Sequence, residues 1–122
     1  MTQEEKQLLL QDLCARLPYG VIVNVNGNNE KVDEINPFEG IITCGFQSFD
    51  VNECKPYLRS MSSMTEEEKN EHFDRTMTIN IVQTSKEVID WLNTHHFDYR
   101  GLIPKGLAIA VTDTNNPYER EQ

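Results

Sequence analysis

The class of fold is decided by residues 19–29, YGVIVNVNGNN. Valines at every second position give this stretch one apolar face, and a period of two is that of a β-strand. The Asn-Gly pair at its end tolerates the positive φ angles of a tight hairpin turn. The sequence therefore predicts a strand that turns back on itself near the N-terminus.

A short helix is expected before this strand. Thr2 and Glu5 have the spacing of a capping box, in which each side chain satisfies the exposed backbone N–H of the other residue. Apolar residues then recur at spacings of three and four as far as Leu17. Because Pro18 disfavours helical dihedral angles in the residue before it, the helix should end near Arg16.

Two more strands are expected after the hairpin. Residues 31–35 form a weak second strand, and residues 41–46 form a third, with Ile42, Cys44 and Phe46 on one side. Residues 47–64 have no clear period and contain Pro56, so we interpret them as a long connection. Such a connection in a compact domain is usually functional or is packed by its own side chains, and the packed form is favoured here.

The second half of the chain predicts two helices and a last strand. Residues 65–68 form a second capping box, whose consecutive glutamates match the helix dipole and read as a solvated face. Residues 84–87 form a third capping box, which opens a helix with Trp91 on its apolar side. Apolar residues alternate with alanines in a final strand at 107–111, and the polar residues 112–122 are expected to fray.

This order of elements predicts one small α+β domain over residues 1–111, followed by a polar C-terminal tail. We expect one mostly antiparallel sheet of about four strands, with about three helices packed mainly on one face. The residues expected in the core are Leu13, Leu17, Val21, Val23, Ile42, Val88, Trp91, Leu92 and Ile109.

Charge and composition exclude several classes of function. The 122 residues include 20 Asp and Glu against 11 Lys and Arg, a formal charge of -9, which disfavours direct binding to nucleic acid or to an anionic membrane. No apolar run approaches the roughly 18 residues of a spanning helix, and the polar first residues do not form a secretory signal. The three cysteines form no CxxC pair and read as reduced thiols. We therefore expect a cytoplasmic protein.

Histidines are the candidate metal ligands and acid–base groups. His95 and His96 lie near Asp98, but adjacent side chains on a helix point about 100° apart and rarely bind one ion together. The HExxH spacing is absent, and the scattered glycines form no phosphate loop, nucleophile elbow or dinucleotide fingerprint. We expect no metal and no cofactor, and an enzyme is the less favoured class.

The densest polar cluster is Asp98-Tyr99-Arg100, in the turn between the Trp91 helix and the last strand. One interpretation is a binding loop, because binding residues concentrate in loops that rigid elements hold in place. The alternative, which we favour, is an internal brace in which Asp98 and Arg100 hold the turn and Tyr99 packs beneath it. Tyr57 and Arg59, in the long connection, are a second pair of candidates.

Three stretches carry a resemblance: LCARLPYGV at 13–21, KPYLRSMSSMTEEE at 55–68 and WLNTHHFDYRGLI at 91–103. They resemble a group of short, uncharacterised proteins encoded by gut bacteria and by their phages and mobile elements. Members of that group often carry a proline where this chain has Ser60. The resemblance implies an intracellular accessory protein of a bacterium or prophage and supplies no catalytic or binding residue.

Three functions remain open. The favoured one is an acidic protein that binds an unidentified protein partner, since Tyr and Arg are common interface anchors. A nucleic-acid mimic is a version of it, weakened because the charge is spread evenly along the chain. The second is an enzyme or a domain that binds a small anionic ligand near residues 95–100, and the third is a homodimer formed through the last strand. The residues expected to carry binding are Tyr57, Arg59, His95, His96, Asp98, Tyr99 and Arg100.

Overall fold

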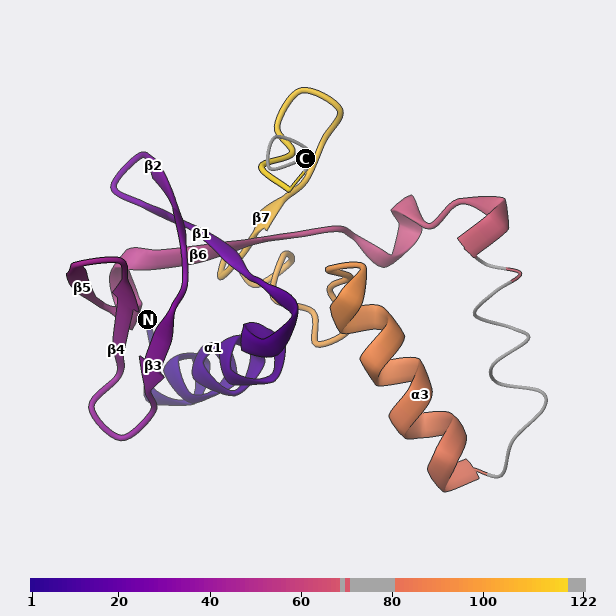
Figure 1. Ribbon diagram of the computed structural model, residues 1–122, viewed down its shortest axis with the longest axis horizontal. Coiled ribbons are helices and arrows are strands. Elements are labelled where there is room, and N and C mark those ends of the chain that lie inside the picture. The colour runs from indigo at the N-terminus through magenta and orange to yellow at the C-terminus, as the bar shows by residue number, and fades with distance from the viewer. Residues whose placement is uncertain (69, 71–80, 119–122) are drawn as a thin grey trace.

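The computed structural model describes residues 1–68, 70 and 81–118 (Figure 1). The elements of the first half are α1 (Gln3–Arg16), the 3-10 helix η1 (Leu17–Tyr19), β1 (Ile22–Val25), β2 (Asn28–Lys31), β3 (Glu34–Asn36), β4 (Ile41–Cys44) and β5 (Gln47–Asp50). Then follow the 3-10 helix η2 (Val51–Glu53), β6 (Cys54–Leu58), the 3-10 helix η3 (Met61–Ser63), α3 (Ile81–Thr94) and β7 (Ile109–Ala110).

The α+β class is confirmed, with more strands than expected. The described residues form two sheets, a four-stranded one in the order β2-β1-β6-β7 and a three-stranded one in the order β3-β4-β5. All strand pairs are antiparallel except β6 with β7. The second sheet was not anticipated, because the sequence predicted one sheet of about four strands. Among the described residues, no helix is long and apolar enough to cross a membrane.

Helix α1 has the predicted start and end. The Thr2 hydroxyl accepts the Glu5 N–H at 3.1 Å, and the Glu5 carboxylate accepts the Thr2 N–H at 2.9 Å. The α-helix ends at Arg16 and is followed directly by η1, a 3-10 helix that contains Pro18. Leu9 and Leu13 are fully buried against the strands. Local capping and a C-terminal proline therefore define this element.

The β1–β2 hairpin is also confirmed, with Asn26 at φ 52° and Gly27 at φ 91° in its turn. The strand expected at 31–35 was wrong, because β2 ends at Lys31 and the chain crosses to the other sheet before β3 begins. The expected position of Phe46 was wrong too. It lies in the two-residue turn between β4 and β5, so it does not share the buried side of Ile42.

The long connection expected at 47–64 contains β5, η2, β6 and η3 instead. Pro56 lies inside β6 without breaking it. The Val32 N–H donates to the Val21 carbonyl at 3.1 Å, and because hydrogen-bonded pairs alternate along the ladder, Val23 is hydrogen-bonded to Glu30 of β2. Val23 and Pro56 therefore form a non-hydrogen-bonded pair. The Pro56 nitrogen therefore points away from β1, to the side where β7 pairs only from Tyr57 onward. No ladder hydrogen bond is lost, which is why the strand tolerates proline.

The third expected capping box is wrong, because the backbone of α3 is already helical from Ile81, before Thr84. The second capping box is present: Glu68 N–H donates to the Thr65 hydroxyl at 3.2 Å, and Thr65 N–H to the Glu68 carboxylate at 2.9 Å. The helix expected to follow it, beyond Glu68, lies mostly outside the described residues.

The C-terminal segment is docked as far as Tyr118 and is not frayed there. The Tyr118 hydroxyl donates to the Tyr57 carbonyl at 2.7 Å and accepts the Ile22 N–H at 3.2 Å. These two groups lie one pair beyond the last ladder contact of β1 with β6. The Tyr118 hydroxyl therefore bridges the point where the two strands separate.

Two apolar clusters stabilise the fold. The larger joins α1 to both sheets, and the smaller consists of Trp91, Leu92 and Phe97 at the end of α3. Six expected core residues are buried, and Leu17, Val88 and Ile109 are half-buried. Helix α3 and the three-stranded sheet lie at opposite ends of the long axis of the molecule (Figure 1).

Candidate functional site

The predicted cluster at residues 98–100 makes the internal contacts of a brace. The Asp98 carboxylate accepts the N–H groups of Leu102 and Ile103 at 2.8 and 2.9 Å. The Tyr99 hydroxyl donates to the Asn93 side chain at 2.9 Å, and Arg100 pairs with Asp12 at 2.9 Å. The turn thus links α3 to α1 and to the following loop.

A buried ion pair in α1 completes this cluster, and the sequence analysis missed it. Arg16 and Asp12 are both fully buried, with the Arg16 Nε 2.7 Å from the Asp12 carboxylate. Arg16 Nη2 also donates to the Phe97 carbonyl at 2.6 Å. The Asp-x-x-x-Arg spacing next to the apolar stripe of α1 was the available signal, since i,i+4 side chains share a helix face.

The two histidines pack on aromatic rings. His95 stacks on Trp91 at 4.3 Å between ring centroids, and its Nδ1 lies 2.9 Å from the Trp91 carbonyl. His96 stacks on Tyr118 at 3.6 Å. Burial is the main cause that lowers the pKa of His96 to about 4, so its ring is uncharged at neutral pH.

Tyr57 is buried in the four-stranded sheet, not exposed in a loop. Its hydroxyl donates to the Asn29 side chain at 2.7 Å and accepts from the Asn24 amide at 3.1 Å. The Tyr57 hydroxyl therefore links β1 to β2 and stabilises the hairpin. An interface role for Tyr57 would require this hairpin to move.

Arg59 is held by Glu68 and by Phe97. Both terminal nitrogens of Arg59 lie 2.7 Å from the Glu68 carboxylate oxygens, and the guanidinium lies 4.2 Å from the centre of the Phe97 ring. Hydrogen bonds from Arg59 are the largest cause that lowers the pKa of Glu68 to about 2. The expectation that residues 66–68 form a purely solvated face is therefore wrong for Glu68.

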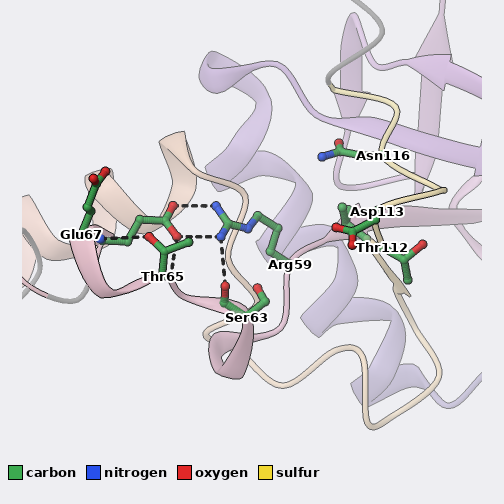
Figure 2. Close-up of a pocket in the computed structure, with 9 residues that line it drawn as sticks. Arg59, Ser63, Thr65, Glu67, Thr112, Asp113 and Asn116 are labelled. Atoms are coloured by element: carbon green, nitrogen blue, oxygen red, sulfur yellow. Dashed lines mark hydrogen bonds and ion pairs between the residues drawn. The ribbon is translucent and has the colours of Figure 1, made fainter.

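A cavity of about 530 Å³ lies beside this pair, between η3, the Thr65 capping box and the C-terminal segment (Figure 2). Hydroxyl, amide and carboxylate groups form most of its wall. Among the described residues that line the cavity, Arg59 is the one cation, and Glu68 already neutralises it. The lining residues are Arg59, Ser63, Thr65, Glu67, Glu68, Val111, Thr112, Asp113 and Asn116.

Metal binding finds no support in the part of the chain that the structure describes, and of the three cysteine thiols only Cys14 is exposed. Within that part of the chain, no group of three His, Cys, Asp or Glu side chains could hold a metal ion. Cys44 and Cys54 are buried, and desolvation raises the pKa of these thiols to about 11 and about 12. Both are therefore protonated and unreactive at neutral pH.

Among the described residues, the most exposed aromatic side chains lie on the three-stranded sheet. Phe38, in the turn between β3 and β4, is 98% exposed, and Phe46, in the turn between β4 and β5, is fully exposed. The two turns lie at opposite ends of β4. We call residues 33–53, which form these three strands, their turns and η2, the β3–β5 face.

Side chains hold the backbone of both turns. The Asn36 side chain accepts the N–H groups of Phe38 and Glu39, each at 3.1 Å. The Asp33 carboxylate accepts the Gly45 N–H, next to Phe46. Asn and Asp side chains stabilise turns in this way, so both phenylalanines are presented by ordered backbone.

The segment that forms the β3–β5 face has no positive charge of its own, although the Lys6 side chain of α1 lies close to Gly40. Residues 32–54 contain no Lys, Arg or His. All five carboxylates of this segment are exposed; they belong to Asp33, Glu34, Glu39, Asp50 and Glu53. The even spread of charge along the chain as a whole conceals this local charge of -5, because bases lie on both sides of the segment.

Comparison with known proteins adds no relative: no family model, curated protein or solved structure matches this chain.

Proposed function

We propose that this chain is a small acidic accessory protein that binds a basic protein partner through the β3–β5 face. The observation that carries the proposal is the pair of exposed phenylalanines on ordered turns within an acidic segment that lacks positive charge. This keeps the interaction function expected from the sequence and moves its centre away from residues 95–100.

Phe38 and Phe46 are the anchors of the proposed interface. Burying an exposed phenylalanine on binding contributes about 2 kcal/mol through the hydrophobic effect. Because Asn36 and Asp33 already order the two turns, little conformational entropy is lost when the anchors are bound. The arrangement suits a partner with two apolar pockets spaced by the length of β4.

The five carboxylates select the charge of the partner. Opposite charges across an interface raise the rate of association and exclude wrong partners. A second copy of this chain would bring the same five carboxylates against one another, which disfavours self-association through this face. A basic surface on a different protein is complementary to it.

The resemblance to proteins of gut bacteria and their phages suggests where such a partner comes from. A host or phage protein in the cytoplasm is the partner class that this origin implies. A basic protein that itself binds nucleic acid fits the charge, and this chain would then compete with the nucleic acid.

Photo-crosslinking followed by titration tests the proposal. A photoreactive phenylalanine analogue at position 38 or 46 should capture a basic protein from host lysate, whereas the same analogue at Met61 or Ile89 should not. Met61 and Ile89 are matched controls because both are exposed apolar residues outside the β3–β5 face.

The captured protein is then purified and titrated against variants by calorimetry. Phe38→Ser and Phe46→Ser should each weaken binding about 30-fold, as expected for an anchor worth about 2 kcal/mol. Met61→Ser and Ile89→Ser should bind like wild type, and added salt should weaken binding. Normal binding by both phenylalanine variants, with loss in Tyr99→Ala and Arg100→Ala, would return the site to residues 98–100.

A further inference from the structure

We infer that the partner contributes an extended basic segment, which adds as a fourth strand to the outer edge of β5. This inference rests on the proposed function and specifies how the β3–β5 face is used. It follows from the direction of the backbone groups in β5, from the side chains of that strand and from the charge around it.

The pairing of β4 with β5 determines which backbone groups of β5 point outward. Val51 donates its N–H to the Gly40 carbonyl at 2.8 Å, so Gly40 and Val51 form a hydrogen-bonded pair. Hydrogen-bonded and non-hydrogen-bonded pairs alternate along an antiparallel ladder. Thr43 and Ser48 therefore form a non-hydrogen-bonded pair. The N–H and C=O groups of Ser48 point away from β4.

A second contact confirms this direction. The Thr43 carbonyl accepts the Asp33 N–H at 2.9 Å, so it faces β3 and not β5. Asp50 also faces outward, but the Glu53 carboxylate accepts its N–H at 3.4 Å. Ser48 is thus the residue of β5 whose outward N–H and C=O have no partner among the described residues, so an added strand can pair with them.

The edge of β5 lacks the usual protection against strand addition. Proteins block exposed edges with lysine, proline, bulges or a covering element. Residues 47–50 contain neither Lys nor Pro, and no other described strand pairs with this edge (Figure 1). By contrast, β3 is followed directly by Pro37, and β2 contains Lys31.

The side chains of β5 define the sequence that would fit. Phe49 is half-buried and pairs with Ile42 on the inner side of the sheet. An apolar residue of an added strand could pack beside the part of Phe49 that remains exposed. On the outer side, Ser48 contacts Thr43 through their hydroxyls at 3.2 Å, and the exposed Asp50 shares that side. An added strand would therefore alternate apolar and basic residues, as strand periodicity requires.

A short peptide of alternating lysine and valine is the probe. It should bind the wild-type protein, and the amide hydrogen exchange of Ser48, measured by NMR, should slow on binding. The same peptide with an N-methyl group on every residue keeps every charge but has no N–H left to donate to the edge of β5. It should bind at least about tenfold more weakly.

Two variants complete the test. Ser48→Pro removes the outward N–H from an edge position where proline is tolerated, and it should weaken binding at least about tenfold. Ser48→Ala keeps the N–H and should bind like wild type. A folding defect in Ser48→Pro leaves the exchange measurement and the methylated peptide to decide.

The outcomes separate the two proposals. Loss of peptide binding in Phe46→Ser, with unchanged Ser48 exchange and normal binding by Ser48→Pro, would overturn strand addition and leave the β3–β5 face in place. Failure of the peptide to bind wild type would also overturn strand addition. The proposed function would then be judged by the captured protein alone.

Discussion

At the scale of single residues, Arg16 and Asp12 are the least expected feature of this protein. Both are fully buried, and Arg100 provides a second cation to the same carboxylate. One aspartate therefore links α1 to the turn after α3. A buried carboxylate between two guanidinium groups stabilises a fold only while its charge is present.

Replacing Asp12 should be strongly destabilising. Asp12→Asn leaves the buried Arg16 guanidinium without its counter-charge, and breaking a buried pair in this way costs about 3–5 kcal/mol. The free energy of unfolding, measured with urea, should fall by this amount. Glu4→Gln, an exposed change in the same helix, is the control and should stay within about 0.5 kcal/mol of wild type. A loss as small as that of the control would contradict the role of Asp12.

The pKa of His96 predicts how stability depends on pH. Its pKa is lowered from 6.5 to about 4 in the folded protein, so between these values the unfolded chain binds a proton that the folded chain does not. The contribution of His96 to stability is therefore complete above about pH 6.5 and is lost as the pH falls toward 4.

His96→Phe tests this prediction because it keeps an aromatic ring to stack on Tyr118 and removes the titrating group. Urea unfolding at pH 7 and at pH 5 should show a smaller drop in stability for the variant than for wild type. Equal drops in both proteins would show that His96 does not titrate as described.

At the scale of elements, β6 is the strand that, among those described, connects the most parts of the fold. It pairs with β1 on one side and with β7 on the other, and its end lies beside the turn after α3. Arg59 donates its N–H to the His96 carbonyl at 2.7 Å and accepts the Asp98 N–H at 2.8 Å. The strand that the sequence presented as a loop is therefore central to the fold.

Tyr118 should stabilise this strand through its hydroxyl. Tyr118→Phe leaves the Ile22 N–H and the Tyr57 carbonyl without the group that bridges them. An unsatisfied buried backbone group costs about 1–3 kcal/mol, so the free energy of unfolding should fall by about that amount.

Tyr19→Phe is the matched control for Tyr118→Phe. The Tyr19 hydroxyl donates at 3.0 Å to Asp90, a half-buried carboxylate that water can reach. Its loss should cost less than the loss of the Tyr118 hydroxyl. Equal losses of unfolding free energy in the two variants would mean that the Tyr118 bridge between β1 and β6 contributes no more than the Tyr19–Asp90 hydrogen bond.

At the scale of the whole molecule, the smaller apolar cluster and the proposed binding surface are separated. The small cluster around Trp91 lies at the end of α3, whereas the β3–β5 face lies at the far end of the long axis (Figure 1). Because the Phe38 and Phe46 side chains are exposed and belong to neither apolar cluster, changes at these residues should leave the free energy of unfolding within about 0.5 kcal/mol of wild type.

We expect the protein alone to be monomeric at low salt. The five carboxylates of the β3–β5 face repel a second copy, and β7, the strand through which dimerisation was considered, has two residues that are half-buried. Light scattering at two concentrations should report the mass of one chain at both. A mass that doubles with concentration would instead favour the homodimer.

The sequence by itself determined the elements whose signals are local. Capping residues and Pro18 defined α1, and the alternating valines with Asn26-Gly27 defined the first hairpin, because backbone preferences act over a few residues. The polar turn at 98–100 was also visible as a candidate brace, although its partners were not.

Only the tertiary structure decided the rest. Arg16 is buried because Asp12 and the Phe97 carbonyl meet it there, and Phe97 is distant in the sequence. Pro56 fits β6 because the pairing of β1 with β2 determines which way its nitrogen points. Phe38 and Phe46 are exposed because β4 places their turns at its two ends. Burial and strand pairing depend on contacts between distant segments, and a local pattern of residues does not encode them.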